Sequence, residues 1–127
     1  DFAVRAIEER CTTRVITAGA IVFDEGDEAD GLYFVGAGQV AADNTQDITG
    51  QTHQVLAAID ALLARAGSDK SKLLMVQIFI KDLADFPAMN AVWEAWLPAG
   101  NAPPRATVQA NMAKPEWRVE MVVTAAL

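Results

Sequence analysis

Residues 101–126 read NAPPRATVQANMAKPEWRVEMVVTAA, and the alternation within this stretch decides the fold that we expect. Polar and apolar residues alternate twice with a period of two, which is the period of a β-strand. The two alternating runs, at 105–112 and 118–125, flank a turn signal at Lys114-Pro115. The sequence therefore predicts a terminal β-hairpin.

The predicted hairpin has one polar and one apolar face. If the turn centres near Lys114-Pro115, odd positions before it share a face with even positions after it. The polar face then carries Arg105, Thr107, Gln109, Asn111, Arg118, Glu120 and Thr124. The other face is apolar and is expected in the core. Taken alone, this pattern favours solvated charges on an exposed sheet over a functional site.

Upstream of the hairpin, helical and strand periods alternate. Between Asp47 and Gly67 apolar residues recur at helical spacing, and Gly67 stands where a C-terminal glycine cap belongs. A half-buried strand is predicted at 74–80, with Leu74, Val76, Ile78 and Ile80 on one face. A second helix follows, with Asp85 as its N-cap and its end at Pro98-Ala99-Gly100.

The N-terminal third is expected to hold a short helix at 1–11, β-rich residues at 13–23 and a strand at 32–35. Between these strands, the acidic run 24–30 is expected to form a solvated loop. The predicted order of helices and strands along the chain, β-β-α-β-α-β-β, favours an α+β fold in which two helices cover one face of a mixed sheet. The 127 residues fit a single domain, 1–127.

Composition excludes several classes of function. The formal net charge is −7, which repels phosphate backbones and makes nucleic acid an unfavourable partner. No run approaches the ~20 apolar residues of a membrane-spanning helix, and no secretory signal is visible. The first residue is Asp1 rather than Met, so we expect that a piece of the native start is absent.

Cys11 and His53 are each the only residue of their type. One cysteine cannot form an intrachain disulfide, and one histidine offers no partner for a metal site. We therefore expect a cytoplasmic protein with no metal and no cofactor, in which His53 lies at the surface. The only serines, Ser68 and Ser71, have no partner histidine for a catalytic triad.

Two stretches, one glycine-rich and one acidic, resemble ligand-binding motifs but lack features that those motifs require. Residues 36–41, GAGQVA, match the dinucleotide pattern G-x-G-x-x-[G/A], but no helix opens directly after them. We interpret these glycines as a close-packed bend. The acidic run 24–30 lacks the ligand spacing of an EF-hand loop.

Arg105 and Glu120 are the residues best suited to chemistry. Pro103-Pro104 stiffens the chain before Arg105 and sets how the arginine enters its strand. An arginine can hold a planar carboxylate through two parallel hydrogen bonds. A neighbouring carboxylate such as Glu120 could orient or deprotonate a water molecule. This pair suits hydrolysis of a small acid but does not identify the substrate.

The segment 101–126 resembles the signature of the RidA/YjgF family, in which proline precedes Arg-[Ser/Ala]-x-Val and a Val/Ile-Glu strand follows. Three upstream stretches agree with the same family: GQV at 38–40, GQTHQVLAAIDALLARAGS at 50–68, and KDLADFPAMNAVWEAW at 81–96. The resemblance covers roughly residues 31–127, and its details are most similar to the YoaB-like branch. It implies a chorismate-mutase-like α+β fold, a homotrimer and ligand clefts between subunits.

The resemblance also implies a function and roles for four residues. The expected reaction is hydrolysis of 2-imino acids to 2-keto acids and ammonia. Arg105 would hold the substrate carboxylate, and Glu120 would position or activate the water. The main chain of Thr107 would contact the imine nitrogen and the water, and Gly38 would shape the cleft wall.

The chain departs from the family pattern at several positions. Thr107 stands where the deaminase-active branch commonly carries Cys, and Ala37 stands where that branch often has Ser. The N-terminal segment lacks the usual Gly-Pro-Tyr motif, and the acidic run 24–30 looks like an insertion. Three alternatives stay open: a non-catalytic trimer that senses small carboxylates through Arg105, a ribonuclease or translation inhibitor, and a chorismate mutase.

Overall fold

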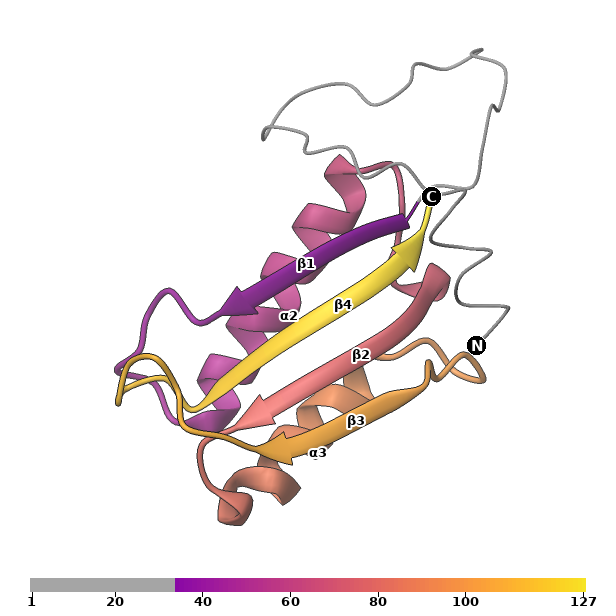
Figure 1. Ribbon diagram of the computed structural model, residues 1–127. Helices are drawn as coiled ribbons and strands as arrows, with labels where there is room; N and C mark the ends of the chain where they lie inside the picture. The colour runs from indigo at the N-terminus through magenta and orange to yellow at the C-terminus, as the bar shows by residue number, and fades with distance from the viewer. Residues whose placement is uncertain (1–33) are drawn as a thin grey trace, which may run out of the picture.

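The computed structural model describes residues 34–127, which form one mixed sheet covered by two helices (Figure 1). The strands and helices are β1 (Phe34–Val40), α2 (Ile48–Arg65), β2 (Leu73–Ile80), α3 (Phe86–Trp96), β3 (Arg105–Gln109) and β4 (Val119–Ala126). Short 3-10 turns, η1 (Lys70–Lys72) and η2 (Leu83–Asp85), precede β2 and α3. The predicted α+β class and element order are confirmed from the second predicted strand onward. The helix at 1–11, the strand at 13–23 and the acidic run 24–30 lie outside the described residues.

The strand order in the sheet is β1-β4-β2-β3. β4 pairs antiparallel with β1 and with β2, whereas β3 pairs parallel with β2. The predicted hairpin of β3 and β4 is therefore wrong, because β2 lies between them. β3 ends at Gln109 and β4 begins at Val119, which leaves enough chain for the connection to pass over the end of β2.

Because β2 lies between β3 and β4, the side chains of β3 point to the faces of the sheet opposite to those predicted. Arg105 is level with Val76 and Thr107 with Ile78, both fully buried on the helix-covered face. Glu120 is level with Phe79, which is paired in turn with Val108 on the open face. Arg105 and Thr107 therefore lie on the opposite face from Glu120. The prediction that they share a face is wrong, since β2 and not a tight turn sets the register of β3.

The hydrophobic core lies between the sheet and the two helices. In Figure 1 both helices lie behind the same face of the sheet, as predicted, with α2 behind β1 and β4. The apolar stripe of α2 is buried at Val55, Leu56, Ile59 and Leu63, and the inward residues of β4 are Val119, Met121, Val123 and Ala125. Across residues 34–127, no helix combines the length and apolar character needed to span a membrane.

Both ends of α2 follow from local sequence. The Asp47 carboxylate accepts a hydrogen bond from the Gly50 N–H at 2.8 Å and caps the N-terminus. At the other end Gly67 has φ +74°, the left-handed conformation that favours glycine. The N–H groups of Gly67 and Ser68 donate to the carbonyls of Ala64 and Leu63, the hydrogen bonds of a Schellman motif. The predicted glycine cap is confirmed.

Two smaller predictions about strands fail. A register shift between Leu73 and Met75 places Leu73 in the core and leaves Leu74 43% exposed. The alternation in the sequence predicted Leu74 as the buried residue. The prediction failed because a bulge shifts which positions face the core and no residue type signals it. Gly36-Ala37-Gly38 is not a bend but part of β1, with Gly38 paired to Val122.

Candidate functional site

Arg105 begins β3 at the edge of the sheet, and its side chain turns toward α3. Its Nη1 donates to the Asn90 Oδ1 at 2.7 Å. The guanidinium carbon lies 5.4 Å from the centre of the Trp93 ring and 5.9 Å from that of Phe86. Cation–π attraction of this kind is worth roughly 0.5–2 kcal/mol, depending on desolvation. One face of α3 thus holds the arginine.

The charge of Arg105 is left available to a ligand. Within residues 34–127 the side chain is half-buried and makes no ion pair with a carboxylate. An arginine has five N–H donors, and Asn90 accepts from Nη1 only. A half-buried cation without a counter-charge favours binding of an anion, and the planar fork of donors matches a carboxylate.

The Asn90 amide is itself oriented by a neighbour on α3. Its Nδ2 donates to the Glu94 Oε1 at 2.7 Å, one helical turn further on. This hydrogen bond turns the amide oxygen of Asn90 toward Arg105. Glu94, Asn90 and Arg105 therefore form a short polar chain that runs from solvent to the edge of the sheet.

Thr107 lies two residues along β3 on the same face as Arg105. Its hydroxyl oxygen is buried and has no hydrogen-bond partner among the described residues. A buried hydroxyl without a partner costs about 1–3 kcal/mol. The cost would fall if a bound molecule or water supplied the missing hydrogen bond.

Glu120 and Gly38 lie together on the open face of the sheet. Glu120 is half-buried in β4, level with Val40 on one side and Phe79 on the other. Gly38 is exposed and sits two residues before Val40 in β1. A methyl group added at Gly38 would meet only the Val122 Cγ2 at 3.8 Å. Packing within this chain therefore does not require glycine at position 38.

The structure therefore divides the predicted site residues into two groups. Arg105 and Thr107 belong to the α3 side, and Glu120 and Gly38 belong to the open face. Val108 is the residue of β3 level with Glu120, three positions from Arg105. At about 3.3 Å per residue and 4.8 Å per strand, Arg105 and Glu120 are separated by roughly 10 Å along the sheet and roughly 10 Å across it.

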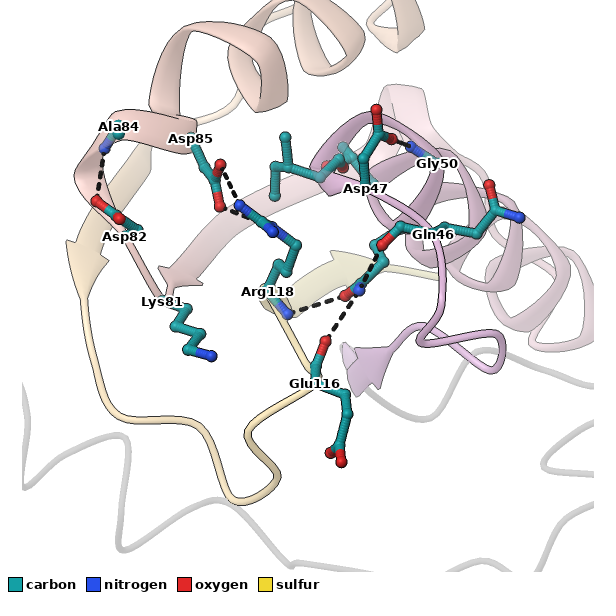
Figure 2. Close-up of polar contacts among 12 residues, drawn as sticks. Gln46, Asp47, Gly50, Lys81, Asp82, Ala84, Asp85, Glu116 and Arg118 are labelled. Atoms are coloured by element: carbon teal, nitrogen blue, oxygen red, sulfur yellow. Dashed lines mark hydrogen bonds and ion pairs between the residues drawn. The ribbon is translucent and has the colours of Figure 1, made fainter.

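The chain that leads into β4 is fixed by a polar network around Gln51 and Arg118. Figure 2 shows Arg118 in this network, with Glu116 and Asp85 on either side of it. The fully buried Gln51 donates from Nε2 to the carbonyls of Asn44, Gln46 and Glu116 and accepts from the Arg118 N–H at 2.9 Å. The Arg118 side chain donates through Nε and Nη2 to the two carboxylate oxygens of Asp85, at 2.9 and 2.8 Å. These hydrogen bonds are the main reason that the pKa of Arg118 is raised above its usual value.

Sequence reasoning missed Phe86, Asn90 and Trp93 as neighbours of Arg105. The sequence pattern places Phe86 and Trp93 on the apolar face of the second helix and does not single out Asn90. The signal was present, because residues 86, 90 and 93 follow helical spacing and share one face. What the sequence lacked was the strand that this face would meet.

The surroundings of His53 and Ser68 are simple. His53 is exposed on α2, as predicted. Ser68 is buried and donates its hydroxyl to the Ala126 carbonyl, a structural contact. In the part of the chain that the structure describes, no three side chains of His, Cys, Asp or Glu come together as a metal site.

A scan against family models matches residues 12–127 to the model described as Endoribonuclease L-PSP. The RutC family protein YoaB of Escherichia coli strain K12 is 45% identical over 96 residues, which cover 76% of this chain and 82% of that protein. The 3-aminoacrylate deaminase RutC of Acinetobacter baylyi is 31% identical over 104 residues, which cover 77% of this chain and 81% of that protein.

Solved structures give the same result. NMB1025 of Neisseria meningitidis, described as a member of the YjgF protein family, superposes with a TM-score of 0.70 at 47% identity. The superposition covers 76% of this chain and 79% of the other. The family resemblance drawn from the sequence, including its YoaB-like details, is therefore confirmed.

Proposed function

The chain belongs to the YjgF/RidA family, and on this basis we propose that it hydrolyses reactive 2-imino or enamino acids to 2-keto acids and ammonia. The family contains enzymatic deaminases, among them the 3-aminoacrylate deaminase RutC of A. baylyi. 2-Iminobutanoate and 2-iminopropanoate are the substrates of first choice for a test. The activity would be cytoplasmic, on the sequence argument from the single Cys11.

The observation that carries the proposal is the setting of Arg105. Its guanidinium is half-buried, seated on Trp93 and Phe86, and held on one side by Asn90. In the described part of the chain no acidic side chain neutralises it. Every 2-imino acid carries a carboxylate next to its reactive carbon, so an anchored carboxylate brings that carbon to a defined place.

The chemistry asked of the protein is modest. Water adds to the imine carbon and one proton passes to the nitrogen, which gives a carbinolamine. The carbinolamine hydroxyl then loses its proton, the nitrogen gains a second one, and the C–N bond breaks to release ammonia and leave the 2-keto acid. Glu120 would accept the proton of the attacking water, and the main chain of Thr107 would contact the imine nitrogen and the water. Gly38 would leave room at the cleft wall. Imines hydrolyse readily, so orientation and a placed water supply most of the acceleration.

The proposed site is completed by a second copy of the chain within a homotrimer. In a single copy Arg105 and Glu120 lie on opposite faces and about 10 Å apart in each direction, too far for one small acid to touch both. The open face also exposes large apolar side chains, with Met75 at 49% and Val108 at 48%. Such a surface favours contact with another protein surface. The number three rests on the family resemblance.

Two other functions compete with this proposal. A trimer that only senses small carboxylates would use Arg105 equally and would have no need of Glu120. The family description Endoribonuclease L-PSP raises nuclease activity, against which stands the net charge of −7. For this chain we propose no nucleic-acid partner, and no membrane partner.

The test is imine hydrolysis, with imino acids generated in situ and unreacted imine trapped by semicarbazide. We expect the wild type to suppress trapping and Arg105→Ala to lose about 10- to 150-fold in kcat/KM, since charge-assisted pairs are worth about 1.5–3 kcal/mol. Arg65→Ala is the matched control, because Arg65 is an exposed arginine at the end of α2.

Glu120→Gln separates the enzyme from the sensor. An enzyme should keep its affinity for 2-ketobutyrate and lose turnover, while Glu116→Gln, at an exposed acid outside the site, should change neither. A wild type that matches the no-enzyme control for several imino acids, yet binds 2-ketobutyrate, would replace the deaminase with the sensor.

A further inference from the structure

We propose that Arg118, through its ion pair with Asp85, is a positioning residue that holds the N-terminal end of α3 where Phe86 and Asn90 can support Arg105. This role rests on the proposed function, since it concerns the same carboxylate anchor. It assigns a task to a residue that neither the site chemistry nor the family signature uses.

Asp85 occupies the N-cap position of α3 but does not cap the helix. An N-cap carboxylate ordinarily accepts from the N–H of the second or third helical residue. The second residue here is Pro87, which has no N–H. Asp85 instead directs both carboxylate oxygens to Arg118, at 2.8 and 2.9 Å, and is only 8% exposed. Asp85 thus makes a long-range ion pair with Arg118 in place of the usual capping hydrogen bond to its own helix.

Arg118 is a fixed attachment point for Asp85. Its N–H donates to the Gln51 Oε1 at 2.9 Å, and its carbonyl accepts from the Lys81 N–H at 2.9 Å. Gln51 is fully buried and also holds the Glu116 carbonyl, so the main chain on both sides of Trp117 is tied to α2. Figure 2 shows the Arg118 side chain reaching from this anchored backbone to Asp85.

The other end of the pair leads directly to Arg105. Phe86 follows Asp85 in the chain, and its ring centre lies 5.9 Å from the Arg105 guanidinium. Asn90, one turn further along α3, accepts the Arg105 hydrogen bond. Movement of the first turn of α3 would therefore change two of the contacts that set the direction of the arginine.

Glu120 is not expected to depend on the same pair, although it lies two residues after Arg118. It is held on both sides by strand pairing, with Val40 in β1 and Phe79 in β2. Loss of the Arg118 side chain should consequently affect binding of the carboxylate more than the water-activating step. This separation distinguishes positioning of Arg105 from general support of the fold.

The experiment compares Arg118→Met, Arg118→Lys and the control Arg65→Met in the whole 127-residue chain. We expect Arg118→Met to raise KM for the imino acid about tenfold and to leave kcat within about twofold. The dissociation constant of 2-ketobutyrate, measured by calorimetry without turnover, should rise by the same factor. Arg118→Lys keeps the charge but not the paired geometry and should recover part of the affinity. Arg65→Met, with the same change in net charge, should match the wild type.

The outcomes separate this role from purely structural support and from the proposed function. A fall in kcat at unchanged KM and unchanged keto-acid affinity, together with a lower Tm, would mean that Arg118 only stabilises the fold and would overturn the inference. If Arg118→Met does not fold, Arg118→Lys is the deciding variant, and wild-type affinity in Arg118→Lys overturns the inference.

The wild type tests the proposed function separately. If the wild type binds 2-ketobutyrate but does not turn over imines, and Arg118→Met weakens that binding, the positioning role is supported and the deaminase function is rejected. A wild type that binds no keto acid overturns both.

Discussion

The two helices cover the same face of the sheet with different chemistry. The stripe of α2 is aliphatic, and Val55, Leu56, Ile59 and Leu63 are each at most 2% exposed. The inner face of α3 combines the buried Met89 and Trp93 with Asn90, which reaches Arg105 at the edge of the sheet. An aliphatic contact can only add stability, whereas an amide and two aromatic rings can hold a charge. The difference favours a structural role for α2 and supports the proposal that binding takes place at α3.

The largest effect expected from this contrast is on stability. Ile59→Ala in α2 should lower the free energy of unfolding by about 2–5 kcal/mol, because it removes a fully buried side chain and leaves a cavity. Urea denaturation measures the change. Affinity for 2-ketobutyrate, measured where the variant is folded, should match the wild type. A large loss of affinity in the folded variant would contradict the proposal that α2 contributes stability and α3 contributes binding.

The reverse behaviour is expected of Asn90→Ala in α3. Loss of the amide that accepts from Arg105 should weaken 2-ketobutyrate binding about tenfold, the equivalent of one hydrogen bond to a charged group. Stability should change little, since the site lies at the edge of the core. Asn101→Ala is the matched control, because its amide bonds the Ser71 carbonyl in an exposed loop. Equal affinities in the two variants would remove Asn90 from the site.

Two glycines sharpen the comparison at a smaller scale. Gly67→Ala should cost about 1 kcal/mol of stability, since the φ of +74° at the end of α2 suits only a residue without Cβ. Gly38→Ala in β1 should not destabilise, because the added methyl meets only the Val122 Cγ2 at 3.8 Å. Thermal unfolding measures both. Reduced keto-acid affinity in Gly38→Ala alone would support the proposed place of Gly38 at the cleft wall.

The smallest effect concerns the loop that joins β1 to α2. Hydrogen bonds from the Thr45 and Gln46 side chains and from the Thr45 N–H lower the pKa of Asp43. Because the pKa of Asp43 is lowered on folding, the stabilisation is present above its ordinary pKa of 3.8 and is lost as pH falls through the folded value. Thr45→Ala should raise the pKa of Asp43 in an NMR titration. An unchanged pKa would show that the hydroxyl is not a significant partner.

Local signals in the sequence were reliable where neighbouring residues decide the outcome. The helical stripe of α2, its glycine cap at Gly67 and the exposed His53 were each predicted from residues close by in the sequence. The family resemblance also selected Arg105 and Glu120 as site residues, and their roles stay a prediction. Leu74 was mispredicted because a bulge changes the alternation without a residue that announces it.

The sequence by itself determined the α+β class, the order of elements from residue 34 onward and the residue types at the candidate site, because period and capping are properties of short segments. Only the tertiary structure decided that β2 lies between β3 and β4, and so that Arg105 and Glu120 lie on opposite faces. Two successive strands can pair with each other or with a third, and the choice depends on how the whole sheet buries its apolar face. The same long-range packing brought Asn90 to Arg105 and Asp85 to Arg118.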